Sequence, residues 1–215
     1  MEYAKPLNNK IAIITGGGSG IGAATCLAFA KAGAKVVVAG RTLGKVQTVA
    51  QQIQAEGGEA VAVAVDVSQG ADVRHMLATA VDHFGGLDML FNNAGISPAG
   101  SITSISEEEW DECIAIDLRS VFLGAKYAIP EMQKRGGGVI LNTAGTLGIR
   151  PCRNKAAYAA AKAGVINLTR AIALDYAPDR IRCNVICPGF VETPLTAGFS
   201  GEAREEFLAG YQPLP

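Results

Sequence analysis

The fold is decided by the stretch Ile11-Ala12-Ile13-Ile14-Thr15-Gly16-Gly17-Gly18-Ser19-Gly20-Ile21-Gly22. Its apolar, mostly β-branched start predicts a strand, and a helix is expected from about residue 20 to 32. Glycines between a strand and a helix let the backbone approach a pyrophosphate at the helix N-terminus. Such a turn can also serve only to pack the helix on the strand, and the spacing of Gly18, Gly20 and Ala23 is weak evidence alone. Its position directly after the first strand favours dinucleotide binding.

The rest of the chain repeats this alternation of short apolar segments and longer helical patterns, with no linker or internal repeat between them. Strands are expected at 11–14, 36–38, 61–65, 89–91, 139–141 and 181–186, and helices at about 20–32, 43–55, 70–84, 106–134 and 154–176. Most strands are uniformly apolar, as in parallel sheets covered on both faces. The sequence therefore predicts one α/β domain over residues 1–215, a doubly wound parallel sheet with helices on both faces.

Composition narrows the class of protein. The chain has 215 residues, 49% of them apolar, and a net charge of -1. No apolar run is long enough to cross a bilayer, and residues 1–10 lack the apolar stretch of a secretory signal, so we expect a soluble, cytoplasmic protein without a membrane partner. Without a basic cluster, we expect no nucleic-acid partner. Five cysteines without a CxxC pair indicate small buried side chains in a reducing compartment.

The end of the second strand bears on which dinucleotide binds. An acidic residue usually bonds the ribose 2′-hydroxyl of NAD at this point, but no Asp or Glu occurs between Lys35 and Gln54. Instead Arg41 follows the strand, and its guanidinium can pair with a 2′-phosphate. The alternative is a solvated loop cation, and Ser19 adds no second positive charge in the glycine turn. NADP(H) is therefore favoured, and NAD(H) stays possible.

Tyr158 and Lys162 stand four residues apart in a predicted helix. Residues at this spacing share a helix face, so the ammonium can lie near the phenol and lower its pKa. A tyrosine with a lowered pKa is a plausible proton donor in catalysis. The alternative is an ordinary contact on a helix surface.

Four motifs resemble those of the short-chain dehydrogenase/reductase family, over residues 10–196. Thr15 to Gly22 is similar to its TGxxxGIG turn, Asn92 to Gly95 to its NNAG, Tyr158 to Lys162 to its YxxxK, and Pro188-Gly189 to its PG after the sixth strand. The resemblance implies a single Rossmann domain. It also implies an oxidoreductase that exchanges a hydride between NADP(H) or NAD(H) and a small carbonyl compound or secondary alcohol.

The resemblance also implies roles for individual residues. Tyr158 would protonate the carbonyl oxygen or accept the alcohol proton, and Lys162 would hold the nicotinamide ribose and favour the phenolate. The residues implied to bind the cofactor are Thr15, Gly16, Gly18, Ser19, Gly20, Ile21, Gly22, Arg41, Asp66, Val67, Asn93, Ala94, Gly95, Tyr158, Lys162, Pro188, Gly189, Val191 and Thr193.

Three of these assignments have structural alternatives. Asp66 would receive the adenine amino group, or it is a turn acceptor beside Ser68. Asn92 to Gly95 would line the cofactor, or they form a simple Asn-Gly turn. Thr193, with Val191, would bond the nicotinamide carboxamide, or it belongs to a capping segment.

Gly145 occupies the position where the family usually has a serine that hydrogen-bonds the substrate oxygen. Loss of one donor aimed at a developing oxyanion costs about a hundred- to a thousandfold in rate. Thr143, Thr146 or a bound water could replace it in part. The alternative function is a dinucleotide-binding protein with impaired turnover that acts as a regulator or assembly partner.

Asp117 is the second departure, because the family usually has asparagine there. The change removes an amide donor and can add a charge. Either the position contributes its backbone carbonyl near Lys162, in which case Asp117 still serves in the catalytic set, or it is a polar residue at a helix kink.

The remaining expectations concern the end of the chain, assembly and the substrate. Family members continue beyond this region through a helix and a seventh strand, so we expect a sheet truncated after its sixth strand, with a helical pattern over 201–210. The resemblance implies a homo-oligomer, a dimer or tetramer, packed through the helices near 106–134 and 154–176. We expect no metal site. Four apolar residues in the segments expected to shape the pocket indicate a hydrophobic substrate: Ile96, Leu147, Ile149 and Phe199.

Overall fold

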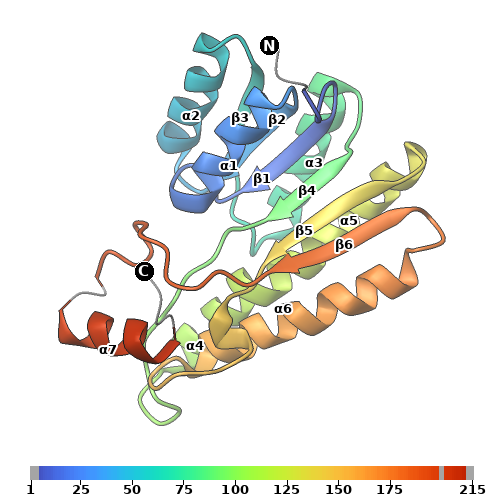
Figure 1. Cartoon of the computed structure of the whole chain (residues 1–215). Helices are drawn as coiled ribbons and strands as arrows, with labels where there is room; N and C mark the ends of the chain where they lie inside the picture. Colours follow the sequence, from blue (N-terminus) through green and yellow to red (C-terminus); the bar gives the residue numbers. More distant parts are fainter. Residues whose placement is uncertain (1–4, 199–200, 212–215) are drawn as a thin grey trace.

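A computed structural model describes residues 5–198 and 201–211 and has one six-stranded sheet at its centre (Figure 1). The strands lie in the order β3-β2-β1-β4-β5-β6, and every neighbouring pair is parallel. Their bounds are β1 Ile11–Thr15, β2 Lys35–Gly40, β3 Glu59–Ala64, β4 Met89–Asn92, β5 Gly138–Thr143 and β6 Ile181–Ile186. The strand order reverses between β1 and β4, which confirms the predicted doubly wound fold.

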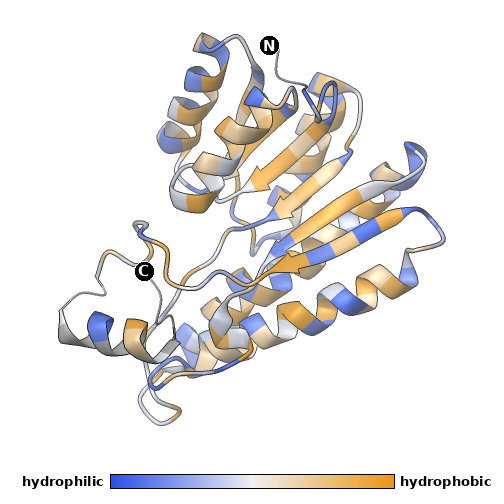
Figure 2. Cartoon of the chain, viewed as in Figure 1, coloured by the Kyte–Doolittle hydropathy of each residue, from blue (hydrophilic) through white to orange (hydrophobic). Residues whose placement is uncertain are grey.

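Helices cover both faces of this sheet. Their bounds are α1 Gly20–Lys31, α2 Leu43–Ala55, α3 Gly70–Phe84, α4 Glu107–Ile114, α5 Ser120–Lys134, α6 Ala156–Asp175 and α7 Glu202–Tyr211. Residues of α1 and α2 pack on one face, and residues of α3, α5 and α6 pack on the other. Figure 2 shows the strands between them as mostly apolar. Within residues 5–198 and 201–211, no helix combines the length and the apolar character that crossing a bilayer requires.

The predicted helix over 106–134 is divided into three parts. Ser106 caps α4 through a reciprocal capping box with Glu109. A π-helical turn, η1, spans Ala115–Arg119, and α5 follows it directly. A wide turn of this kind inserts an extra residue into the helix and is frequent at functional sites. Here it contains Asp117.

The edge strand β6 differs from the uniformly apolar strands because it is buried on one face only at its start. Its residues alternate, with Ile181 and Cys183 buried but Arg182 and Asn184 exposed. The central strand β1 is buried at all five positions. The difference arises because α1 and α2 lie over the β1–β3 half of the sheet (Figure 1).

Candidate active site

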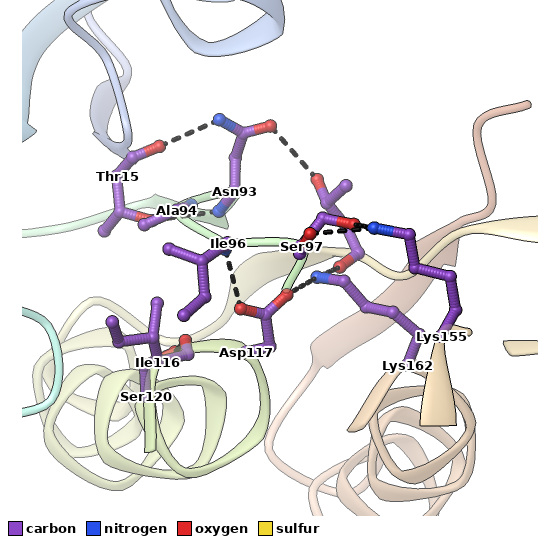
Figure 3. Close-up of polar contacts among 11 residues, drawn as sticks. Thr15, Asn93, Ala94, Ile96, Ser97, Ile116, Asp117, Ser120, Lys155 and Lys162 are labelled. Carbon is purple, nitrogen blue, oxygen red and sulfur yellow. Dashed lines mark hydrogen bonds and ion pairs between the residues drawn. The ribbon is translucent and has the colours of Figure 1, made fainter. Parts of the chain in front are cut away.

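Thr15 joins the end of β1 to the loop after β4. Its hydroxyl donates to the Phe91 carbonyl at 3.3 Å and accepts from the backbone N–H groups of Asn93 at 2.9 Å and Ala94 at 3.1 Å. The Asn93 amide also donates to the Thr15 carbonyl at 3.1 Å (Figure 3). Thr15 is buried, so it holds the two loops together and does not line the hollow between them.

The glycines of the first turn meet two different requirements. Gly16 and Gly20 have φ angles of 67° and 51°, in the left-handed region that favours glycine. A Cβ on Gly22 would lie 2.2 Å from the Gly16 carbonyl oxygen, so α1 packs on the turn only without a side chain there. Gly22 therefore packs against the backbone of the turn, whereas Gly16, Gly18 and Gly20 border open space.

A hollow with two compartments runs across the carboxyl ends of the strands. The compartments share Gly16, Ser19, Ala94 and Gly95. The first compartment, which we call the catalytic compartment, is also lined by Gly20, Ile21, Asn93, Asp117, Thr143, Tyr158, Lys162, Pro188, Gly189, Val191 and Thr193. The second, which we call the cation compartment, is also lined by Gly18, Arg41, Thr42, Lys45, Asp66 and Val67. Of the residues predicted from the sequence, Thr15, Gly22 and Gly145 lie outside both linings.

The cation compartment contains one basic residue that sequence reasoning missed. Lys45 lies in the first turn of α2, four residues after Arg41, and a Cβ on Gly18 would lie 3.0 Å from the Lys45 Cβ. The i, i+4 spacing from Arg41 was the available signal. Asp66 lines the same compartment while its Oδ1 accepts from the N–H and the hydroxyl of Ser68, at 2.9 and 2.7 Å. Its turn-acceptor role is therefore present in the structure.

The lining of both compartments suits a dinucleotide. Glycine backbone forms the floor between them, and side chains at Gly16 or Gly18 would project into contact with Asn93, Ala94 or Lys45. Basic groups stand at one end, and the Tyr158 and Lys162 side chains stand at the other. The hollow lies at the topological switch point of the sheet, where ligands of open α/β sheets bind.

Lys162 is held deep in the catalytic compartment. Its Nζ donates to the Thr143 carbonyl at 3.0 Å and forms an ion pair with Asp117 Oδ2, also at 3.0 Å (Figure 3). It lies 5.5 Å from the centroid of the Tyr158 ring. Because Tyr158 and Lys162 follow each other at i, i+4 on α6, both side chains reach the same hollow.

The predicted lowering of the Tyr158 pKa was wrong for this structure. Burial raises the pKa of the phenol, and the negative charge of Asp117 and then the Cys113 thiol raise it further. The main physical reason is burial of the phenol, and the carboxylate of Asp117, which pairs with Lys162, adds to it.

Gly145 lies close to the Tyr158 hydroxyl. A Cβ at Gly145 would stand 3.3 Å from Tyr158 Oη, so a serine there would bring its own hydroxyl beside the phenol. Thr143 lines the hollow, but its hydroxyl donates to the Asn93 side chain at 3.3 Å. Thr146 begins the 3-10 turn η2, Thr146–Gly148, and its N–H donates to the Pro188 carbonyl.

Asp117 makes contacts that neither sequence interpretation contained. Its side chain is fully buried in η1, and Oδ1 accepts from the Ile96 N–H at 2.8 Å. The carboxylate thus bridges the loop after β4 and the lysine of α6. Lys155 was also missed: its Nζ donates to the carbonyl and the hydroxyl of Ser97 and to the Pro98 carbonyl.

The segment after β6 closes the front of the catalytic compartment. Thr193 and Thr196 exchange hydrogen bonds in a turn, and Thr193 also lines the compartment. A Cβ on Gly20 would lie 3.0 Å from Thr193 Cγ2, so this segment packs against the glycine turn.

The apolar residues that hinted at a hydrophobic substrate lie in different places. Ile96 lines the cation compartment, whereas Leu147 is buried outside both linings and Ile149 is 69% exposed. Phe199 lies outside the described residues.

Comparison with known proteins agrees with this fold. The family model of short chain dehydrogenases matches residues 10–203. The chain is 41% identical over 194 residues to the 2,5-dichloro-2,5-cyclohexadiene-1,4-diol dehydrogenase of Sphingobium indicum, covering 90% of this chain and 78% of that protein. It is 42% identical over 193 residues to the cyclohexanol dehydrogenase of an Acinetobacter species, covering 89% and 77%. A crystal structure of a short-chain type dehydrogenase/reductase from Mycobacterium marinum superposes with a TM-score of 0.88 at 35% identity, covering 97% and 82%.

The doubly wound fold and its hollow define a Rossmann-type oxidoreductase. The chain belongs to the short-chain dehydrogenase family. It is accordingly an enzyme that interconverts alcohols and carbonyl compounds with NAD or NADP. Because the named relatives are dehydrogenases, the alternative of a binding protein without turnover is not favoured.

Proposed function

We propose that Tyr158 is the general acid and base of an NADP(H)-dependent alcohol dehydrogenase and that Lys162 is its electrostatic and binding partner. The nicotinamide ring supplies the carbon that gives or takes the hydride. The observation that carries the proposal is the presence of Tyr158, Lys162 and the glycine turn around one hollow.

The residues of the catalytic compartment would have separate roles in proton transfer, cofactor binding and exclusion of water. Tyr158 would accept the hydroxyl proton of the alcohol during oxidation and return it to the carbonyl oxygen during reduction. Lys162, fixed by the Thr143 carbonyl, would orient the cofactor ribose. Val191 and Thr193 in front, and Asn93 and Gly95 behind, would enclose the nicotinamide and limit the entry of water.

The preference for NADP(H) rests on two basic side chains. Arg41 and Lys45 both line the cation compartment beside Gly18. Together they would pair with a 2′-phosphate, and the lining there has no carboxylate directly after β2 to receive a 2′-hydroxyl. The expected effect of Arg41→Ala combined with Lys45→Ala is a rise of at least about tenfold in the Kd of NADP+, since charge-assisted bonds contribute about 1.5–3 kcal/mol each. The Kd of NAD+ in the same titration is the control, and an equal loss for both cofactors would refute the preference.

An alicyclic secondary alcohol is the proposed substrate class. The two relatives above carry names of dehydrogenases that act on ring alcohols. The apolar side chains of Val191, Pro194 and Leu195 in the catalytic compartment fit such a ring.

We also propose a cytoplasmic homo-oligomer. Support for a cytoplasmic location is that the five cysteines are free, as a reducing compartment requires. Support for assembly comes from large apolar side chains on the two long helices, Phe122 on α5 at 46% exposure and Leu174 on α6 at 79%.

The experiment that tests the activity is a steady-state assay of cyclohexanol with NADP+ and with NAD+, followed by the absorbance of the reduced nicotinamide. We expect turnover with both cofactors and a lower KM for NADP+. No reduction of either cofactor by cyclohexanol or by an acyclic secondary alcohol would contradict the proposal.

A further inference from the structure

We propose that Asp117 is a positioning residue whose buried carboxylate neutralises Lys162 and thereby sets the pH at which alcohol oxidation begins. The inference rests on the proposed roles of Tyr158 and Lys162 and adds a control of their charge. It is carried by the contacts of one side chain in the π-helical turn η1.

The ion pair is almost completely removed from solvent. The Asp117 side chain is 0% exposed and that of Lys162 is 4% exposed, with Oδ2 and Nζ 3.0 Å apart. Water cannot screen the pair, so each charge acts strongly on its neighbours. An exposed ion pair would have little effect on a nearby phenol.

The two oxygens of Asp117 face a hydrogen-bond donor and a cation, which favours the charged carboxylate. Oδ1 faces the N–H of Ile96 at 2.8 Å, and Oδ2 faces the ammonium of Lys162. Both neighbours are donors only, whereas a protonated carboxyl would need an acceptor for its own hydrogen. Burial raises the pKa of Asp117, while the charge of Lys162 and the bond from Ile96 oppose that rise.

The surrounding backbone leaves room for this carboxylate. A Cβ on Gly95 would lie 3.0 Å from Oδ2, so the loop after β4 packs closely against the carboxylate. The π-helical turn widens the helix where Asp117 projects toward Lys162 (Figure 3).

Few other charged or titratable groups face the pair. Tyr158 lies on α6, and Lys155 lies at the N-terminal end of that helix. The nearest group on α4 is the buried thiol of Cys113, whose pKa is also raised by the charge of Glu112. The β4 loop and β5 contribute only the Ile96 N–H and the Thr143 carbonyl. The fixed charges next to Tyr158 are therefore those of Asp117 and Lys162, which cancel.

This cancellation affects the two directions of the reaction differently. Oxidation needs the Tyr158 oxygen to accept a proton, so it requires the phenolate, which an uncompensated ammonium would stabilise. Reduction needs the phenol O–H, which the paired lysine leaves intact at neutral pH. Asp117 therefore favours carbonyl reduction at neutral pH and moves alcohol oxidation to alkaline pH.

The test is Asp117→Asn, which keeps the shape and removes the charge. We expect the limb of the kcat profile over which oxidation rises with pH to move to lower pH by at least about one unit, a tenfold change in proton affinity. Asp111→Asn, the same change at an exposed position of α4, is the matched control and should leave the limb in place. Phenolate absorbance during alkaline titration of the free enzyme, with Tyr158→Phe subtracted, should show the same shift without any turnover.

The outcomes separate this inference from the proposed function. An unchanged limb and an unchanged phenolate titration in a folded Asp117→Asn enzyme would overturn the inference alone. Wild-type turnover in Tyr158→Phe would instead refute the proposed function. If Asp117→Asn does not fold, Lys162→Met tests the pair from the other side. The unopposed Asp117 should then move the phenolate titration to higher pH, and a shift to lower pH would overturn the inference.

Discussion

Gly145 is the residue at which a single side chain would reach the Tyr158 hydroxyl. A Cβ there would lie 3.3 Å from Tyr158 Oη, so Gly145→Ser adds a hydroxyl donor beside the reacting oxygen. We predict that kcat for carbonyl reduction rises by about a hundred- to a thousandfold, the usual value of one oxyanion donor. Steady-state kinetics of the single variant and of Gly145→Ser combined with Tyr158→Phe will check this. The gain should vanish in the double variant, and a gain that survives there would point to another cause.

At this scale the sequence predicted residues that act through short spacing and missed those that act through tertiary contact. Tyr158 and Lys162 were predicted because four positions separate them on one helix. The ion pair between Asp117 and Lys162 joins different helices, and no local pattern indicates it. The predicted direction of the Tyr158 pKa was wrong because burial of the phenol, and then the charge of Asp117, are also tertiary effects.

Among the elements, β1, β4 and α5 are joined by one carboxylate at the end of the sheet opposite the hollow. Asp88 accepts from the Ile11 N–H at 2.9 Å and from two nitrogens of Arg135 at 3.0 and 3.1 Å. Its replacement would leave a buried N–H and a half-buried guanidinium without this acceptor.

We predict that Asp88→Ala lowers the free energy of unfolding by about 3 kcal/mol, since loss of one partner in a largely buried pair costs about that much. Urea unfolding followed by circular dichroism will measure it. Asp82→Ala, at an exposed position of α3, is the control and should change the value by less than about 0.5 kcal/mol. Equal effects of the two changes would contradict the role of Asp88.

The elements themselves were predictable because apolar runs and helical periodicity are local. All six strands and the helices between them occur where expected, including α7 at Glu202–Tyr211. The π-helical turn Ala115–Arg119 was not predicted, because one extra residue in a turn leaves the composition of a helix unchanged. The exposure of Arg182 and Asn184 agrees with the alternation of apolar and polar residues at the start of this edge strand.

For the whole molecule, buried titratable groups predict a loss of stability in alkali. Burial raises the pKa of Cys26 from 9.0 to about 12 and that of Cys183 to about 11. Their folded-state pKa values exceed the unfolded ones, so their contribution to stability is complete below about pH 9 and is lost as the pH rises above it. Each group contributes up to about 1.4 kcal/mol per pH unit in that window.

We predict that Cys26→Ala reduces the slope of unfolding free energy against pH between about pH 9 and 11 by up to that amount. The absolute stability at pH 7 also changes, because Cys26 packs from α1 into the core, so the slope is the informative quantity. Urea unfolding at a series of pH values will measure it. A slope equal to that of the wild type would show that Cys26 ionises equally in both states.

The central claim, hydride exchange at a carbon next to Tyr158, is tested most directly by isotope transfer. The enzyme is incubated with NADP+ and cyclohexanol that carries deuterium on its carbinol carbon, and the reduced cofactor is analysed by mass spectrometry. We predict that the reduced cofactor carries the deuterium and that Tyr158→Phe forms it at least about a hundredfold more slowly, the contribution of a positioned acid or base. Reduced cofactor without deuterium, or an equal rate in Tyr158→Phe, would contradict the account.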